Sequence, residues 1–204
     1  MTRSKCSSIR WGRPLVDLPY RPRSYGTGGG DDFSGTQLTT GSRTDRGFYA
    51  KPSAAWGDLD ILARFYVSEF NNPPEQMSIT LSNDVFGYNL GRPQGPQLYC
   101  GVFDSCMLGF SLNGVDFTPP VDMGGSFAVD GIWDLRVTYK MAGHAIGFDA
   151  WREDGSAGPW HFSATADLYA AIGRIQPWAR AFTGINPGGP CRLLAFRCNG
   201  VVLI

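Results

Sequence analysis

The sequence predicts an all-β protein, a two-sheet antiparallel β-sandwich of about ten or more short strands. Apolar and polar residues alternate along several short segments, which is the period of a strand with one buried face. Clusters of Gly, Pro, Asn and Asp separate these segments, as turns separate the strands of a sandwich. Asp outnumbers Glu by 15 to 3, and Arg outnumbers Lys by the same ratio. Because Asp favours turns while Glu and Lys favour helices, the composition disfavours helix.

Residues 1–46 are expected to form an irregular, basic N-terminal arm with a Gly-rich connector. Three prolines between positions 14 and 22 forbid a regular helix, and the glycines at 26–30 are typical of a flexible connector. Residues 1–23 carry a net charge of +5 and residues 24–167 one of −9. Basic residues on an acidic body favour docking on another protein subunit, with a solvated tail as the alternative. The predicted partner-binding residues are Arg10, Trp11, Arg13, Arg21 and Arg23.

The sandwich domain is expected over residues 47–204, where the alternation begins. Two closing strands are predicted at 192–197 and 201–204. Residues 168–172 fit one helical turn or a strand, and both remain open. The predicted buried faces are Leu59, Ile61, Ala63, Phe65 and Val67; Met77, Ile79 and Leu81; Cys106, Leu108, Phe110 and Leu112; Trp133, Leu135, Val137 and Tyr139; and Ile146, Phe148 and Ala150.

The five cysteines are an odd number, which a disulfide scaffold would rarely leave. We therefore expect reduced thiols, with a Cys100–Cys106 pair across a hairpin as the alternative. Cys191 and Cys198 lie seven residues apart, so one continuous strand would direct them to opposite faces. The N-terminus lacks an apolar signal region, and no segment is long and apolar enough to span a membrane. We expect synthesis in the cytoplasm without a signal peptide, and no membrane insertion.

No motif predicts an enzyme. Residues 124–128 approach the spacing of a nucleophile elbow but lack its last glycine, and only His144 and His161 are available as a base. Asp58 and Asp60 would lie about 7 Å apart on one outward strand face. Glycosidases place such a pair across a cleft instead, so a solvated face is the simpler interpretation.

No cofactor or nucleic-acid partner is expected. The cysteines and histidines lack the spacing of a zinc site, and the glycines at 26–30 lack the following Lys of a phosphate loop. Asn83-Asp84 or Asp154-Gly155 could contribute to a loop Ca²⁺ site, although single Asp-Gly pairs are typical of ordinary turns.

The most informative pattern is a set of aromatic residues near two predicted loops. Sugar recognition uses an aromatic face for the ring and planar polar groups for the hydroxyls. The alternative for the two tryptophans is that they flank the hairpin and pack on the core or on each other. The predicted ligand-binding residues are Trp151, Arg152, Asp154, Trp160 and His161 in one loop, and Asn83, Asp84 and Tyr88 in the other.

Residues 132–139, the Gly143 turn, residues 146–148 and the Asp154-Gly155 turn together resemble the concanavalin A-like lectin/glucanase (laminin-G-like) jelly rolls. Residues 58–65 resemble the strand that often opens their core, and the resemblance covers residues 47–204. It implies a jelly-roll fold and glycan binding. The glucanases of that family carry an acidic strand of the type Glu-x-Asp-x-x-Glu, which this chain lacks, so the resemblance does not imply hydrolysis.

Three function classes follow from these observations. The leading hypothesis is a non-enzymatic component of a larger assembly, such as the decoration, spike or tail of a phage or virus particle. This component would be a homo-oligomer or bound to the particle through the arm, and surface glycans would be its ligands. The alternative is a free-standing carbohydrate-binding, lectin-like module. The third class is a glycan-cleaving enzyme on the same scaffold.

Overall fold

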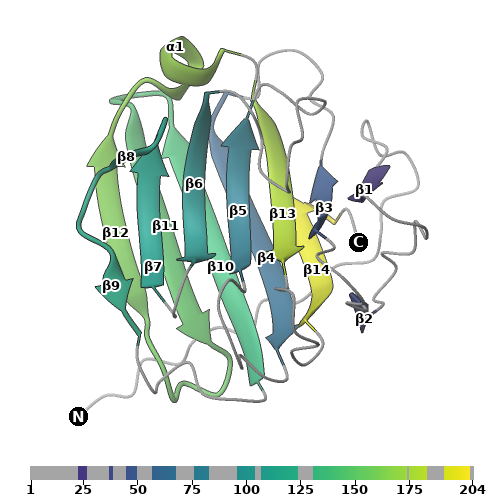
Figure 1. Ribbon diagram of the computed structural model, residues 1–204. Coiled ribbons are helices and arrows are strands. Elements are labelled where there is room, and N and C mark those ends of the chain that lie inside the picture. Colours follow the sequence, from purple (N-terminus) through teal and green to yellow (C-terminus); the bar gives the residue numbers. More distant parts are fainter. Residues whose placement is uncertain are drawn as a thin grey trace.

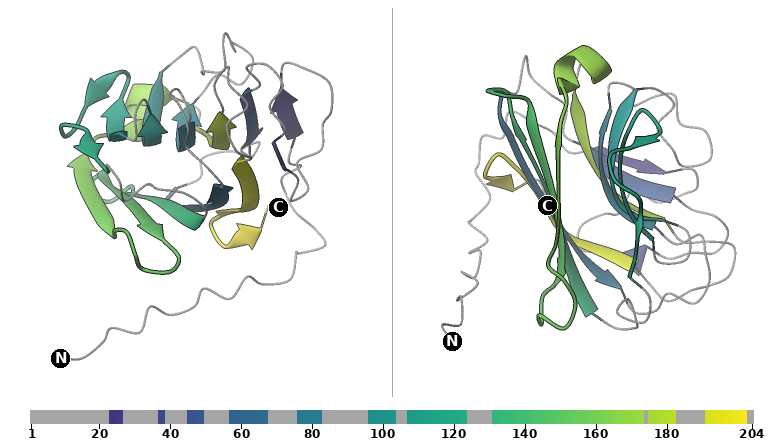
Figure 2. Two further views of the ribbon diagram at one scale, coloured as in Figure 1. Left: turned by 60° about the horizontal axis from the view of Figure 1, so that its bottom comes forward. Right: turned by 90° about the vertical axis from the view of Figure 1, so that its left-hand side faces the viewer.

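The strands form two antiparallel sheets that face each other across one core, as the two layers in Figure 2 show. The computed structural model describes residues 23–26, 37–38, 45–49, 57–67, 76–82, 96–103, 107–123, 131–173, 175–182 and 191–202. Among these residues only one short helix occurs, and it is not long enough to cross a membrane. The predicted all-β sandwich is confirmed.

The first sheet has eight strands (Figure 1). β9 (Val121–Asp122) pairs with β7 beside the main path. The order along that path is β1 (Arg23–Gly26), β3 (Asp45–Tyr49), β13 (Gln176–Phe182), β5 (Gln76–Ser82), β6 (Gln97–Phe103), β7 (Met107–Leu112) and β8 (Val115–Asp116).

The second sheet has seven strands. β2 (Gln37–Leu38) pairs with β14 beside its main path. The order along that path is β12 (Trp160–Thr165), β11 (Ala145–Arg152), β10 (Gly131–Lys140), β4 (Leu59–Val67), β14 (Cys191–Cys198) and β15 (Val201–Val202).

Two strands lie within the predicted irregular arm. β1 pairs with β3 in the eight-stranded sheet, and β2 pairs with β14 in the seven-stranded sheet. They are four and two residues long, which is too short for apolar alternation to predict a strand. Their structure depends on backbone pairing with neighbours distant in sequence, so the local composition suggested an irregular segment there.

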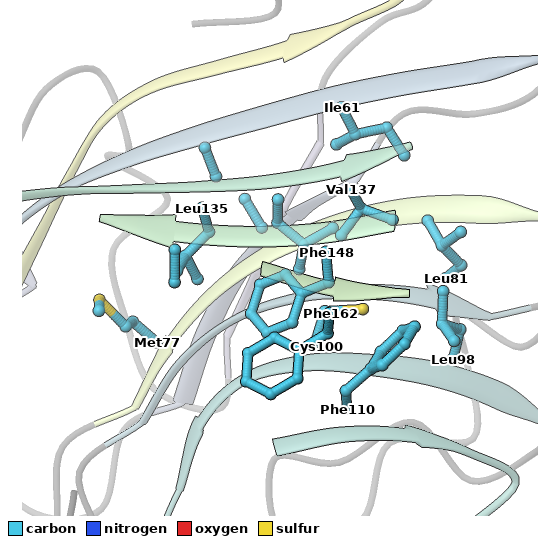
Figure 3. Close-up of a cluster of buried hydrophobic side chains, with 14 of the residues drawn as sticks. Ile61, Met77, Leu81, Leu98, Cys100, Phe110, Leu135, Val137, Phe148 and Phe162 are labelled. Carbon is cyan, nitrogen blue, oxygen red and sulfur yellow. The ribbon is translucent and has the colours of Figure 1, made fainter. Parts of the chain in front are cut away.

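The core lies between the sheets and consists of the predicted alternating faces. Figure 3 shows Leu135, Val137 and Phe148 of one sheet opposite Leu98 and Phe110 of the other. Aromatic rings fill its centre, where Phe148 stacks on Phe162 with the ring centroids 5.6 Å apart. Leu112 is partly buried against this core, whereas Cys106 and the side chain of Val67 lie outside the described residues. Burying each large apolar side chain contributes about 1.5–3 kcal/mol, so these faces hold the sheets together.

The segment left open between helix and strand is the helix α1 (Leu168–Ile172). Asp167 caps its start by accepting a hydrogen bond from Ala170 N–H at 3.0 Å. Gly173 ends it with φ at +81°, a conformation that glycine adopts without steric cost. Leu168 and Ile172 are buried, so the short helix is anchored to the core.

The cysteine predictions are partly corrected. Cys100 is a free, buried thiol, and its cross-strand partner is Phe110 rather than Cys106. β14 carries a bulge between Leu193 and Ala195, and the register therefore pairs Cys191 with Val67 and Cys198 with Ile61. Those two partners lie six residues apart on β4, so the bulge brings both cysteine positions to the same face of the sheet. The predicted opposite faces assumed a strand without a bulge.

Candidate functional site

The predicted aromatic loop connects β11 to β12 and is held by its own hydrogen bonds. Arg152 N–H donates to Ala157 O at 3.0 Å, and Gly155 N–H donates to Arg152 O at 3.0 Å. Asp154 accepts a hydrogen bond from Ser156 N–H at 2.8 Å. This is the local side-chain turn that Asp commonly makes, so Asp154 stabilises the loop.

Strand alternation divides the predicted ligand residues between the two faces of the sheet. Phe148 and Ala150 point into the core, so Trp151, between them and the loop, belongs to the outer face. Trp160 is paired with Ala150 in register, and His161 is paired with Asp149. Trp160 therefore faces inward and His161 outward. The five loop residues do not form one site.

Trp160 and Arg152 lie on the inner side. The Trp160 ring stacks on Trp133 with the ring centroids 6.1 Å apart and the planes 16° from parallel, and it packs against the core. The Arg152 side chain is 17% exposed, its Nε lies 3.3 Å from Asp154 Oδ2, and its guanidinium lies against Gly131. Of the two interpretations of Trp160, packing on the core is the one that the geometry favours.

Trp151 is partly exposed on the outer face, at the end of a row that crosses three strands. Its register partner on β10 is Asp134, and the partner of Asp134 on β4 is Arg64. Arg64 donates to both carboxylate oxygens of Asp134 at 2.8 Å and to Glu153 Oε1 at 3.1 Å. The hydrogen bond to Asp134 raises the pKa of Arg64. Asp134 is only 1% exposed, so the carboxylate of this bidentate pair is buried beside the tryptophan, while Arg64 is partly exposed.

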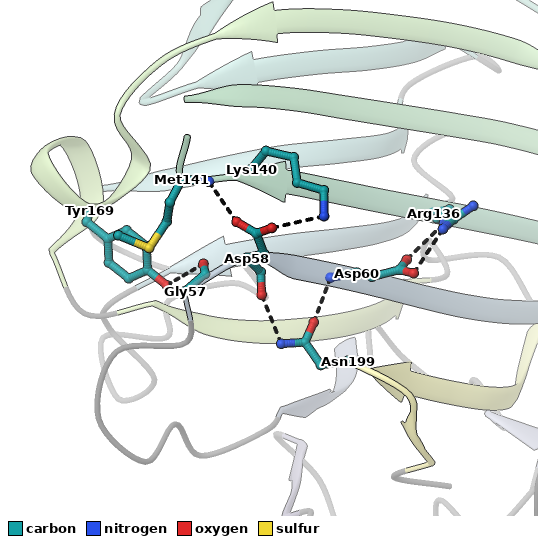
Figure 4. Close-up of polar contacts among 8 residues, drawn as sticks. All are labelled: Gly57, Asp58, Asp60, Arg136, Lys140, Met141, Tyr169 and Asn199. Atoms are coloured by element: carbon teal, nitrogen blue, oxygen red, sulfur yellow. Dashed lines mark hydrogen bonds and ion pairs between the residues drawn. The ribbon is translucent and has the colours of Figure 1, made fainter. Parts of the chain in front are cut away.

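The neighbouring outward row contains a second set of charged pairs. His161 Nδ1 contacts Asp149 Oδ1 across β12 and β11, and Asp149 is paired in register with Arg136. Arg136 donates to both oxygens of Asp60 at 2.8 and 2.9 Å, as Figure 4 shows. The hydrogen bond to Asp60 raises the pKa of Arg136. Arg136 reaches Asp60 diagonally, since the register partner of Arg136 on β4 is Leu62.

We call this surface the tryptophan face. It combines one partly exposed indole ring with planar carboxylate and guanidinium groups held by mutual contacts. Such a surface can stack on the apolar face of a sugar ring and exchange hydrogen bonds with its hydroxyls. Its members are Trp151, Asp134, Arg64, Glu153, Asp149, Arg136, Asp60 and His161.

Several members of the face were not among the predicted ligand residues. Asp134 and Arg136 lie on β10, the hairpin partner of β11, whereas Arg64 lies on β4, which is placed next to β10 by the sheet order. The alternation of apolar and polar residues in the sequence predicts that these side chains lie on the outer face of their strands. Their position beside Trp151 depends on the register, which the sequence pattern did not supply.

The other predicted residues are placed as follows. His144 Nδ1 lies 3.0 Å from the Tyr139 hydroxyl, at the turn between β10 and β11 and away from the tryptophan face. Arg23 begins β1, and only its backbone is described. Asn83, Asp84, Tyr88, Arg10, Trp11, Arg13, Arg21 and residues 124–128 lie outside the described residues.

Asp58 and Asp60 are each held by hydrogen bonds (Figure 4). Asp58 accepts from Met141 N–H at 2.9 Å and from Lys140 Nζ at 2.9 Å. These hydrogen bonds lower the pKa of the Asp58 carboxyl, and the bond from Met141 N–H has the larger effect. Asn199 closes the strand end, with its amide donating to Asp58 O at 3.0 Å and accepting from Asp60 N–H at 2.7 Å. The pair is therefore part of an exposed network that fixes the start of β4.

No three His, Cys, Asp or Glu side chains among the described residues gather into a group that could hold a metal ion. Asp154 belongs to one of the two loops suggested as calcium sites, and its carboxylate contacts Ser156 N–H and Arg152 within its own turn. The other loop, at Asn83-Asp84, lies outside the described residues.

The fold is similar to that of solved plant lectins. Lectin I-B4 from Griffonia simplicifolia, in a metal-free form, is 13% identical with a TM-score of 0.62, over 88% of this chain and 91% of that one. Peanut lectin bound to a nine-residue peptide is 12% identical with a TM-score of 0.62, over 91% and 92%. Winged bean acidic lectin complexed with methyl-α-D-galactose is 11% identical with a TM-score of 0.62, over 79% and 84%.

These likenesses establish the fold. No family model matches the sequence, and no curated protein sequence matches it. The chain has the concanavalin A-like jelly-roll fold of the legume lectins, which confirms the resemblance seen in the sequence.

Proposed function

We propose that this protein is a non-enzymatic carbohydrate-binding β-sandwich whose ligand lies on the tryptophan face. The observation that carries the proposal is the partly exposed Trp151 ring beside two rows of fixed polar groups. The lectin fold adds support by analogy, since one fold can carry many functions.

The ligand would contact the face in two ways. The apolar side of a pyranose ring would stack on the Trp151 indole, as sugars commonly do on aromatic rings. Its hydroxyls would then donate to the exposed oxygens of Asp149 and Glu153, whose side chains are 28% and 48% exposed. Hydrogen bonds to His161 and Arg64 already hold these groups, so little conformational entropy is lost on binding.

The charge pairing argues against hydrolysis at this face. A glycosidase needs one carboxylic acid that stays protonated to donate to the leaving group. Both oxygens of Asp134 and both oxygens of Asp60 already accept hydrogen bonds from an arginine. These groups are suited to accept hydrogen bonds rather than to donate a proton.

The assembly role remains a prediction. It rests on the basic residues of the arm, and of these only the Arg23 backbone belongs to the described residues. The lectin likeness bears on glycan binding and not on a virus particle.

A glycan array tests the proposal with the whole chain and two matched variants. Trp151→Ala should weaken binding about 30-fold, since losing the stacked ring costs about 2 kcal/mol. Val115→Ala is the control, because Val115 is an exposed apolar side chain, 71% exposed, on the other sheet. The proposal is wrong if no glycan binds, or if Trp151→Ala binds as well as the unmodified chain.

A further inference from the structure

We propose that the tryptophan face selects uncharged glycans, and that Asp149 and Glu153 are the specificity-determining residues that reject acidic ones. This inference rests on the proposed function. It follows from how the charges of the face are paired.

The guanidinium groups of the face are already engaged. Arg64 makes a bidentate pair with Asp134 and a third contact with Glu153. Arg136 makes a bidentate pair with Asp60. Recognition of a sugar carboxylate or sulfate usually relies on the same two-pronged geometry of arginine. An acidic sugar that made such a contact with Arg64 would therefore have to displace an existing carboxylate.

Displacement at Arg64 is especially unfavourable. Asp134 is 1% exposed, and its two oxygens are both paired with Arg64. If a ligand took the guanidinium, the Asp134 carboxylate would be left buried without its cation, which is among the most costly changes in a protein interior. The pair that borders Trp151 is thus closed to anionic ligands.

The remaining charge of the face is negative. Four carboxylates (Asp60, Asp134, Asp149 and Glu153) face two guanidiniums, which leaves an excess of two negative charges when His161 is neutral. Among the described side chains, two cations outside the face are already engaged. Lys140 is paired with Asp58, and Arg197 lies beyond Leu62 on β14 and has its own interactions.

Two of the three exposed acids of the face lie on either side of the aromatic ring, while the third, Asp60, is paired with Arg136. Asp149 precedes Trp151 by two residues on the same outward face of β11, about 7 Å away along the strand. Glu153 follows it by two residues and contacts Arg64 of the Trp151 row. A ligand stacked on the indole would therefore lie between two carboxylates. These carboxylates accept hydrogen bonds from neutral hydroxyls and repel a second anion.

The experiment compares each neutral glycan that binds with its sialylated and sulfated counterparts on the same array, at low and moderate salt. The unmodified chain should bind the neutral member at least about tenfold more tightly. We call the ratio of the two affinities, neutral over acidic, the gap. The double variant Asp149→Asn/Glu153→Gln should reduce this gap at least about threefold. The control is Asp116→Asn/Asp122→Asn, which removes the same charge from the other sheet, and the gap should persist in it.

The outcomes separate the two proposals. Equal or tighter binding of acidic glycans that still depends on Trp151 would overturn the selectivity and leave the proposed function intact. A gap that is the same in both double variants would show that Asp149 and Glu153 do not set it. Binding to no glycan, neutral or acidic, would overturn the proposed function and the selectivity together. Thermal unfolding of each variant confirms that it is folded.

Discussion

Replacing Trp160 with alanine tests whether strand alternation assigns the two loop tryptophans correctly. A Trp→Ala change at a fully buried site costs about 3–5 kcal/mol. Trp160 is only partly buried, so we expect about 2–3 kcal/mol, of which the stack on Trp133 contributes about 0.5–1.5 kcal/mol. Trp151→Ala should cost less than about 1 kcal/mol, because that ring lies on the outer face.

The assay is urea and thermal unfolding followed by far-ultraviolet circular dichroism, which does not depend on tryptophan fluorescence. For a chain of this size, Trp160→Ala should lower the Tm by about 4–12 °C. Trp160→Leu, which retains an apolar side chain, should recover part of the loss. If Trp151→Ala destabilised the protein more than Trp160→Ala did, the assignment of inner and outer faces would be refuted, and with it the tryptophan face.

Three further predictions concern charge and thiol chemistry. Asp134→Asn should reduce the free energy of unfolding by about 2–4 kcal/mol in urea titrations, because Arg64 would lose a buried partner; a cost below about 0.5 kcal/mol would contradict the buried pair. Asp58→Asn should destabilise the protein most above about pH 4, because the folded state lowers the pKa of Asp58. That contribution is present above the unfolded pKa and is lost as the pH falls through the folded one, so unfolding curves of the two chains should converge in acid. Burial raises the pKa values of Cys100 and Cys198, so a thiol reagent at pH 8, followed by mass mapping, should label both only after denaturation; rapid native labelling would contradict their burial.

The fold was predictable because its evidence is local. The alternation of residues 133–139 marks a strand with one buried face, and each of the four predicted inward side chains, Trp133, Leu135, Val137 and Tyr139, is buried. The helix at 168–172 was ambiguous, since five residues carry too little periodicity to separate helix from strand. The bulge in β14 left no sequence signal, because it is defined by pairing with β4.

The candidate site was predictable only in part. The sequence identified the loop and its tryptophans, and it offered core packing as the alternative for both. Trp151 follows the inward Ala150 on the same strand, so the alternation of side chains places it on the outer face. The inward position of Trp160, by contrast, follows from its pairing with Ala150 on the neighbouring strand. Asp134 neighbours Trp151 through the β10–β11 hairpin, but Arg64 joins them only through an order of strands that pairs β4 with β10. Sequence patterns of one chain do not encode that order, since strands of similar composition could pair in many ways.

The Arg64–Asp134 pair contributes more to the geometry of the face than to stability. Removing a carboxylate and a guanidinium from water costs about as much as their attraction returns, so a buried ion pair is weak evidence for a stabilising role. An outward sheet position has no need of such a pair, because a solvated polar side chain would suffice there. What the pair does provide is fixed orientation. Arg64 is held by two hydrogen bonds to Asp134, and it holds the Glu153 carboxylate beside the Trp151 row. A surface ordered in this way before a ligand arrives loses less entropy on binding, which is the property that a weak, multi-hydroxyl ligand such as a sugar requires.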